Sequence, residues 1–422
     1  MPGNEAQKAA GRRRFWRIAG AGAAFQGGSA AVDSATVVAS LTHMLTGSAL
    51  AVGYASAVLR LGWLLPQLPV GYLAERTERR MPFYAFGAFG RAAAAGAIAV
   101  LLWQGADWPQ VPLTAGFLAL WTVYAFVSGV VAVPYNDIVG RAIPSGRRSR
   151  MLAWRFFGGG LLAIAAAGAL RLAFGVMPPL KTYAFMFALG SALMLLSSAL
   201  FVSAGEPPSA PRKRTSARSV GVAGFLREGL ATFRKDRAFR LFLIFHWLGS
   251  ATLMALPFYV VAARESGIGL AGVGTLLAAQ TAGALVSNPL WGRIGDGIGK
   301  LQLLRMVSML RLLSPALVLV LLAAGTGIAG FAALYLVIGA MMNGVTIGYL
   351  SFLMEISPEE RRPAYSAWFN TFAAPAALSP LLGALLASLI ATPAVFAAAI
   401  AAALAQFAVL NQLDRLAGEA AP

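Results

Sequence analysis

The stretch GYLAERTERR at residues 71–80 separates two long apolar runs, and GRIGDGIGK at residues 292–300 separates two others. The two stretches correspond at an offset of 221, which pairs Glu75 with Asp296. Two longer stretches, AIPSGRRSRMLAWRFF and ISPEERRPAYSAWFNTF, correspond at an offset of 214. The same polar patterns therefore recur in both halves of the chain, and parallel repeats of this kind predict a membrane protein built from two similar bundles.

The composition excludes an ordinary soluble domain. Of the 422 residues, 58% are hydrophobic and 12% are charged, whereas soluble domains carry about 25% charged residues. A bilayer-crossing helix needs roughly 20 apolar residues. Runs of this kind predict an all-α membrane protein with twelve transmembrane helices in two pseudo-symmetric six-helix bundles. The predicted spans are 18–43, 48–73, 82–103, 112–138, 151–175, 182–203, 239–262, 269–291, 302–323, 328–354, 364–390 and 393–411.

The longest hydrophilic stretch divides the chain near its middle. It begins with EPPSAPRKRTSARS, whose composition is typical of a flexible basic linker. Apolar residues then recur at helical spacing, which indicates an amphipathic helix lying on the cytoplasmic membrane surface. We therefore predict an N-terminal bundle over 1–204, a cytoplasmic linker with an amphipathic helix over 205–237, and a C-terminal bundle over 238–422.

The basic residues predict the orientation. The net charge is +18, but the Lys and Arg residues form short clusters between apolar runs, so we expect no nucleic-acid partner. With the N-terminus inside, 27 of the 34 basic residues lie on the inner side, two lie outside and five fall within spans. Because cytoplasmic loops carry excess Lys and Arg, we expect a multi-pass protein of the bacterial inner membrane with both termini cytoplasmic.

Several kinds of chemistry have no signal in the sequence. The chain has no Cys and only two His, which gives no pattern for a disulfide framework or a metal centre. A phosphate-binding Gly-x-x-x-x-Gly-Lys loop and a convincing catalytic triad are also missing. We therefore expect no enzyme activity, no metal and no cofactor, and we expect a monomer.

The repeated loop motif and the twelve-span pattern together resemble the major facilitator superfamily. The resemblance covers nearly the whole chain. It implies alternating access, with the motif acids pairing with neighbouring helix ends in one state and releasing in another. Arg141, at the end of the fourth span, is the expected partner of Glu75. The motif positions are Gly71, Glu75, Arg76, Arg79 and Arg80, and the weaker second copy has Gly292, Asp296 and Lys300.

This sequence departs from the family pattern at some positions. Glu75 stands where the motif usually has Asp, which keeps the charge. The fourth span lacks the Arg of the drug–proton antiporter signature, and the fifth span has Gly158 to Gly160 but no Pro. These departures count against a drug antiporter.

Asp33 is the only acid predicted deep in the membrane. Burial raises the pKa of a carboxyl group, so Asp33 is a candidate for coupling transport to a proton gradient. Arg60 lies at a similar depth in the second span and could pair with Asp33 or bind an anionic solute. The alternative is a structural role for Asp33, either in an ion pair or in polar contact with Ser34 and Thr36.

Other polar and aromatic residues are weaker candidates. Gln26 and Gln280 lie on spans expected to line a central cavity, although such residues more often join helices. Arg91 and Arg311 correspond at an offset of 220, and this symmetry suggests that they fasten each bundle on its cytoplasmic side. The candidate cavity aromatics are Trp63, Tyr124, Trp247 and Tyr259.

The sequence therefore predicts a secondary active transporter, a symporter or antiporter that moves a small organic solute by alternating access. Protons or another ion would drive it. The net positive charge at membrane depth favours an anionic or zwitterionic solute. A lipid or drug exporter of the same fold and a non-transporting assembly factor or sensor on this scaffold remain alternatives.

Overall fold

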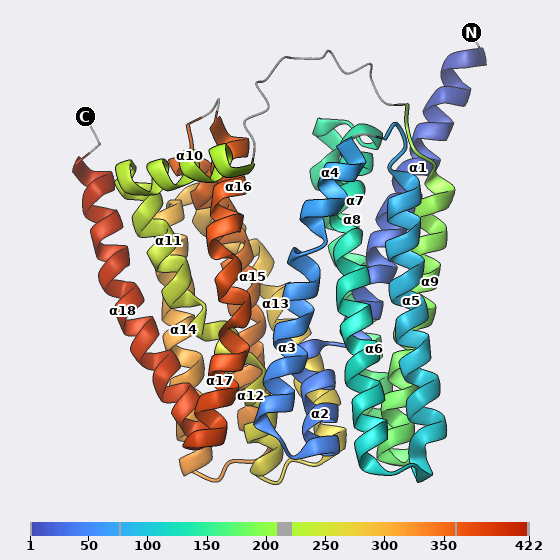
Figure 1. The fold of residues 1–422 in the computed structure, drawn as a ribbon, viewed down its shortest axis with the longest axis vertical. Helices are drawn as coiled ribbons and strands as arrows, with labels where there is room; N and C mark the ends of the chain where they lie inside the picture. Colours follow the sequence, from blue (N-terminus) through green and yellow to red (C-terminus); the bar gives the residue numbers. More distant parts are fainter. Residues whose placement is uncertain (1, 76, 209–221, 359–360, 420–422) are drawn as a thin grey trace. The chain divides into compact units, whose positions relative to one another are not determined.

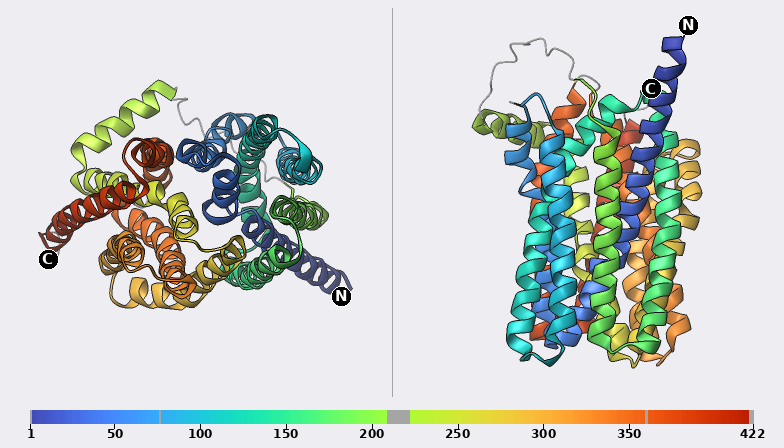
Figure 2. Two further views of the ribbon diagram at one scale, coloured as in Figure 1. Left: turned by 90° about the horizontal axis from the view of Figure 1, so that it is seen from below. Right: turned by 90° about the vertical axis from the view of Figure 1, so that its right-hand side faces the viewer.

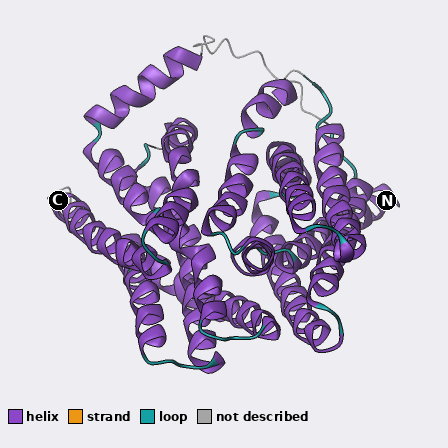
Figure 3. Ribbon diagram, turned by 60° about the horizontal axis from the view of Figure 1, so that its bottom comes forward, coloured by secondary structure: helices purple, strands orange, loops and turns teal. Residues whose placement is uncertain are grey.

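The computed structural model describes residues 2–75, 77–208, 222–358 and 361–419, and its regular elements in these ranges are all helical (Figures 1 and 3). The chain divides into two compact units. The first contains the helices up to residue 204, and the second contains those from residue 222 onward. Helix α13 is the exception, because its residues up to Thr281 group with the first unit.

The first unit is a bundle of long helices, which Figure 2 also shows end-on. Within it, α1 packs against α8 and α9, α5 packs against α6 and α9, and α3 packs against α6. Its elements are α1 (Pro2–Ala31), η1 (Ser34–Val38), α2 (Ala39–Thr46), α3 (Ala49–Leu64), α4 (Gln67–Glu75), α5 (Met81–Gln104), η2 (Gly105–Asp107), α6 (Gln110–Val130), α7 (Ala132–Ala142), α8 (Ser145–Val176) and α9 (Pro179–Ala204).

The second unit is also a helix bundle. In this unit α14 packs against α15 and α18, while α12 packs against α17 and α18. Its elements are α10 (Val222–Lys235), α11 (Arg237–Gly249), α12 (Ala251–Glu265), α13 (Leu270–Gly297), α14 (Lys300–Ala323), α15 (Ile328–Ile356), α16 (Arg362–Ala373), η4 (Ala374–Leu378), α17 (Ser379–Leu389) and α18 (Thr392–Glu419).

Eleven helical segments of the described chain are long and apolar enough to cross a bilayer. They coincide with eleven of the twelve predicted spans, and their ends differ by five residues or fewer. The predicted span 18–43 is not a continuous apolar helix, because the chain breaks at Asp33 between α1 and η1. The prediction of an all-α protein with many membrane spans is confirmed.

Proline accounts for breaks in two other spans. Pro66 lies between α3 and α4, and Pro134 lies in the first turn of α7, directly after α6 ends. Proline has no amide hydrogen and its ring clashes with the preceding turn, so a helix kinks or ends there. The second and fourth spans are therefore bent at fixed positions.

Aromatic packing forms the core of each unit. In the first unit the Tyr84 ring lies 4.1 Å from the Phe201 ring, measured between centroids. In the second, the Phe242 ring contacts the rings of Tyr349 and Phe369. Large apolar side chains also lie on the outside, such as Val176, which is 83% exposed. A lipid-facing surface accounts for them, because lipid is as apolar as the core.

Two glycines let α3 and α6 touch backbone to backbone. A Cβ added at Gly129 would collide with the carbonyl oxygen of Gly62, and a Cβ added at Gly62 would collide with the backbone of Ala125. Small residues at membrane helix crossings allow this approach. The contact fixes the middle of the second span against the fourth span.

Replacing Gly129 by Ala should therefore destabilise the protein by about 1–3 kcal/mol, the usual effect of overpacking. Thermal unfolding of the purified protein in detergent measures this change. Gly168→Ala on α8 is the matched control, because a Cβ there meets nothing within 4 Å. Equal melting temperatures for the two variants would show that the α3–α6 contact is not close.

Candidate functional site

Asp33 interrupts the helix of the first span, and its side chain caps the helical turn that follows. Its backbone is extended, with φ −57° and ψ 127°, so α1 cannot continue past it. The Asp33 carboxylate accepts hydrogen bonds from the amides of Ala35 at 3.1 Å and Thr36 at 2.9 Å, and from the Thr36 hydroxyl at 2.8 Å. These amides begin the π-helical turn η1 and would otherwise lack acceptors. Asp33 is thus an N-cap in the middle of the first span.

Arg60 lies on α3, half-buried, in the vicinity of Asp33. Helix α3 contacts η1, which begins directly after Asp33. Within the described residues, however, no ion pair joins the two side chains, and the short contacts of Asp33 go to its own chain segment. Polar contacts of Asp33 with Ser34 and Thr36 were expected if its role is structural. The contact with Thr36 is present.

The other predicted polar residues lie apart from Asp33. Gln26, on α1, faces α8, where a Cβ at Gly159 would meet its side chain. Gln280 is half-buried on α13.

The four candidate aromatics have different surroundings. Trp63 is 39% exposed and lines a cavity described below. Tyr124 is buried and stacks on Trp121 at 4.8 Å. Tyr259 is buried against Phe396, and Trp247 donates to the carbonyl of Phe372. Trp63 is thus the one of the four that lines this cavity.

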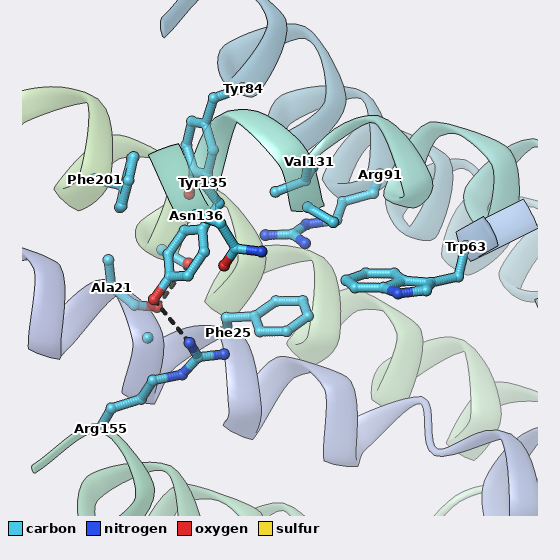
Figure 4. Close-up of a pocket in the computed structure, with 13 residues that line it drawn as sticks. Ala21, Phe25, Trp63, Tyr84, Arg91, Val131, Tyr135, Asn136, Arg155 and Phe201 are labelled. Carbon is cyan, nitrogen blue, oxygen red and sulfur yellow. Dashed lines mark hydrogen bonds between the residues drawn. The ribbon is translucent and has the colours of Figure 1, made fainter. Parts of the chain in front are cut away.

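A cavity of about 180 Å³ opens inside the first unit (Figure 4). Helices α1, α3, α5, α7, α8 and α9 supply most of its wall. Two arginines, two tyrosines, an asparagine and a serine are its polar residues, and none of its lining residues is acidic. The lining residues are Ala21, Gly22, Phe25, Trp63, Tyr84, Arg91, Val131, Ala132, Tyr135, Asn136, Arg155, Ser197 and Phe201.

The two arginines enter this cavity from different helices (Figure 4). Arg155, on α8, donates to the Tyr135 hydroxyl at 2.7 Å. Arg91, on α5, lies 4.1 Å over the centre of the Phe25 ring and is 3% exposed. Arg91 was expected to fasten the bundle, and its contact with Phe25 does join α5 to α1. Its guanidinium also faces the open space.

The second unit has a related arginine with a different environment. Arg311, on α14, donates to the Tyr349 hydroxyl at 2.5 Å and lies over that ring. Gln406 approaches the same hydroxyl at 3.4 Å. Tyr349 corresponds to Tyr135 at the offset of 214. The symmetry predicted from Arg91 and Arg311 therefore extends to a tyrosine in each unit.

A carboxylate cluster joins helix ends at one end of the first unit. Glu206, just after α9, accepts hydrogen bonds from the backbone amides of Arg80 and Met81 at 2.9 Å, which caps α5. The same carboxylate pairs with Arg141 at 2.7 Å, and Arg141 also binds Asp137 at 2.6 Å. Glu206 thus connects α9, α5 and α7.

The Glu206 carboxyl remains charged in this cluster. Its partial burial alone would raise its pKa, but the hydrogen bonds from Arg141 and from the amides of Arg80 and Met81 outweigh burial and lower the pKa below its usual value. The ionised form is therefore the one that holds the helix ends together.

The predicted gating motif lies beside this cluster. Gly71 is on α4, where a Cβ would meet nothing within 4 Å, and Arg79 is exposed. Arg80 contributes its amide to Glu206 and lies 3.7 Å from Asp137. Arg76 and the Glu75 side chain lie outside what the structure describes. The expected pairing of Arg141 with Glu75 therefore stays a prediction, while Glu206 and Asp137 are its described partners.

The second copy of the motif has a simpler arrangement. Lys300, at the start of α14, pairs with Glu355 at 2.8 Å, which links it to the end of α15. Gly292 is exposed on α13. The Asp296 side chain is not among the described ones. No group of three or more metal-ligating side chains occurs within the described ranges.

Sequence reasoning did not assign Glu206, Tyr135 or Arg155 to a site. A signal existed for Asp137, because it precedes Arg141 by four residues, the spacing at which an acid and a base pair on a helix. Tyr135 has its repeat counterpart in Tyr349. Glu206 had no such signal, because its partners are 65 and 126 residues away along the chain.

Comparison with known proteins identifies the fold. The family model described as Major Facilitator Superfamily matches residues 19–374. No sequence among the curated proteins matches the chain.

Three of the similar solved structures are transporters. A POT family transporter in complex with 5-aminolevulinic acid is 14% identical, with a TM-score of 0.70 over 95% of this chain and 96% of that one. The nucleoside transporter NupG, as a D323A mutant, is 14% identical, with a TM-score of 0.69 over 94% and 99%. A bacterial homologue of the iron transporter ferroportin, in an inward-facing state, is 15% identical, with a TM-score of 0.67 over 95% and 98%. At such low sequence identity, the structural similarity shows a shared fold and nothing about the solute. Because the family match covers most of the sequence and the fold agrees over nearly the whole chain, the protein belongs to the Major Facilitator Superfamily.

Proposed function

We propose that this protein is a secondary transporter that moves a small organic solute across the inner membrane by alternating access, with Asp33 as the site of proton coupling. The observation that carries the proposal is the Asp33 carboxylate. It lies at a break in the first span, half-buried, and its short contacts are three donors from its own segment. A carboxylate without a fixed ion pair can take up and release a proton.

The solute is proposed to be anionic. Arg60, Arg91, Arg155 and Arg311 lie within predicted spans, where Asp33 is the only acid of comparable depth. A cation at this depth needs a partner or a polar cavity. The similar solved structures include a peptide transporter, a nucleoside transporter and a homologue of an iron transporter, and they support solute transport in general. The solute itself is not inferred from them.

The two alternatives have less support. A lipid or drug exporter needs a large, weakly polar cavity, whereas the cavity of the first unit is small and contains two arginines. A non-transporting sensor would be favoured if Asp33 were bound to another helix, but its hydrogen bonds stay within its own segment.

Conformational control is proposed to reside at the helix ends. The Glu206 cluster holds α5, α7 and α9 together next to the motif residues Gly71 and Glu75, and Lys300 with Glu355 joins two helix ends in the second unit. Ion pairs of this kind can form in one state and break in another. We propose that the protein works as a monomer, because one chain contains both repeats.

The coupling role is tested by Asp33→Asn. The amide oxygen of Asn can accept the same hydrogen bonds and is an equally good N-cap, so thermal stability should stay within about 1 kcal/mol of wild type. Solutes are found by a thermal-shift screen against metabolites, because a ligand that binds the folded form raises its melting temperature. In proteoliposomes a proton gradient should no longer drive accumulation of the best stabiliser, while solute exchange continues.

Thr36→Val is the matched control for Asp33→Asn. It removes one hydrogen bond to Asp33 and keeps the charge, so gradient-driven accumulation should persist with some loss of stability. Accumulation by Asp33→Asn at the wild-type level would eliminate Asp33 as the proton carrier. Transport driven by another ion would then be measured in the same vesicles.

The Glu206 cluster makes a pH-dependent contribution to stability. The pKa of the Glu206 carboxyl is lower in the folded protein than in the unfolded chain. The stabilisation is therefore complete above the pKa of Glu206 in the unfolded chain, and it is lost as the pH falls through its pKa in the folded protein. Glu206→Gln should lower the free energy of unfolding by about 1–2 kcal/mol at pH 7 and remove this acid-dependent part. Chemical unfolding in detergent between pH 3 and 7 measures both.

Glu228→Gln is the control for Glu206→Gln. Glu228 forms an exposed ion pair with Arg361, and exposed pairs contribute about 0–1 kcal/mol. If the two variants had equal stabilities at every pH, Glu206 would not hold the helix ends together.

The proposed orientation is tested by labelling. The natural chain has no Cys, so single cysteines can be introduced without removing others. Asn4→Cys, Ser216→Cys and Glu419→Cys should resist a membrane-impermeant maleimide in intact cells, whereas Ala106→Cys, in the connection after α5, should react. Reaction at any of the first three positions would reverse or break the predicted topology.

A further inference from the structure

Arg91 is a buried cation without a hydrogen-bond acceptor. It is 3% exposed, and its Nε atom is buried and unpartnered among the described residues. Its described cation–π contact is with the Phe25 ring, whose centre lies 4.1 Å from the guanidinium carbon. A ring face attracts a guanidinium by about 0.5–2 kcal/mol, which does not satisfy its five N–H donors.

Arg155 adds a second cation to the same space. It donates one hydrogen bond to Tyr135, while its own Nε is also buried and unpartnered. The charge of Arg155 acts unfavourably on that of Arg91. With no acid in the cavity wall, both guanidinium groups lack a negative partner there.

The counterpart in the second unit, Arg311, also has a buried Nε without a partner among the described residues, but it has one hydrogen-bond acceptor that Arg91 lacks. Arg311 is 5% exposed, like Arg91, but it donates to the Tyr349 hydroxyl at 2.5 Å. In the first unit the corresponding tyrosine, Tyr135, is bound by Arg155 instead. Arg91 faces a cavity at the place where an acceptor would be needed (Figure 4).

We infer that this cavity binds a small organic oxyanion, such as a carboxylate, between Arg91 and Arg155. Guanidinium groups bind carboxylates through paired, charge-assisted hydrogen bonds. Asn136 adds amide donors in the wall, and Phe25 and Trp63 provide apolar ring surfaces (Figure 4). A cavity of about 150 Å³ can hold benzene, so the 180 Å³ here suits a carboxylate with a body of about one ring.

The inference rests on the proposed function for the anionic character of the solute and names the site that would bind it, but occupancy of the site can be measured by binding alone, without transport or proton coupling. The occupant can be a free anion or the headgroup of an anionic lipid. Both present an oxyanion to the arginines, and the experiment below distinguishes them.

The test uses benzoate, with neutral benzamide as its isosteric control, on the purified full-length protein. Benzoate should raise the melting temperature in a concentration-dependent way and benzamide should not. Arg91→Gln should weaken apparent benzoate affinity by at least about tenfold. Arg91→Lys should recover part of the loss, because it keeps the charge without the planar fork. Arg305→Gln, which removes an exposed pair with Asp414, should leave benzoate binding unchanged.

The melting temperature without ligand separates a binding site from a structural fastener. An unpaired buried charge is unfavourable, so Arg91→Gln should melt at or above the wild-type temperature. If it melted several degrees lower and benzoate stabilised it as much as wild type, Arg91 would be a fastener and the proposal would be wrong.

A second variant keeps the test decisive if Arg91→Gln does not fold. Asn136→Asp places a carboxylate in the cavity wall, where it can pair with the arginines. It should melt higher than wild type and no longer respond to benzoate. A wild-type benzoate response in this variant would overturn the proposal.

Lipid is tested in nanodiscs of phosphatidylcholine with and without phosphatidylglycerol. An Arg91-dependent rise in melting temperature with phosphatidylglycerol would assign the site to a lipid headgroup, and an Arg91-dependent rise with benzoate alone would assign it to a free anion. If neither probe gave an Arg91-dependent shift, no oxyanion site would exist there.

Discussion

A backbone polar group in the hydrocarbon core has no water to bind, so its hydrogen-bond partner must come from the protein. This constraint makes the spans helical. It also means that the backbone groups freed at a break in a helix need hydrogen-bond partners from elsewhere in the protein. At Asp33 the first span breaks, and the carboxylate supplies the acceptor for the amides of Ala35 and Thr36. The repair needs an oxygen atom but does not need the negative charge. A neutral amide would serve the fold equally well, so the cap itself does not require the charge of Asp33, and the proton coupling proposed above would require it.

The same constraint governs how closely the helices approach. Once each span satisfies its own backbone, neighbouring helices are held by packing, and association in lipid depends on close contact between small residues. Gly62 and Gly129 bring α3 and α6 into direct backbone contact. The bends at Pro66 and Pro134 follow this crossing along the same two spans, just after α3 and α6 end. The first unit is therefore tight where α3 meets α6. The cavity around Arg91 and Arg155 borders this crossing, because its wall includes Trp63 and Val131.

The fold was predictable because it follows from local quantities: run length, basic clusters and repeat spacing. Eleven spans were placed to within a few residues, and the break at Asp33 was missed because apolarity averaged over a window does not register one capping residue. The candidate site was harder to predict. Glu206 meets Arg141 only after the helices pack, and Arg155 shares a cavity with Arg91 although 64 positions separate them in the chain. Which residues face a common space depends on helix rotation, and the repeat offsets do not encode it.

The two repeats differ at a position that lines the proposed oxyanion site. The offset of 214 places Phe369 where the first half has Arg155. Phe369 is buried against Phe242 and His246, so an aromatic ring stands in the second unit where the first has a guanidinium and a cavity. With that ring in place, Tyr349 is available to Arg311. With Arg155 in place, Tyr135 is taken and Arg91 is left with a ring face. The two units therefore differ in which arginine the tyrosine accepts from: Tyr349 accepts from Arg311, whereas Tyr135 accepts from Arg155. An unpaired buried charge destabilises a protein, and the oxyanion proposed above would supply the negative partner that Arg91 and Arg155 lack in the cavity wall.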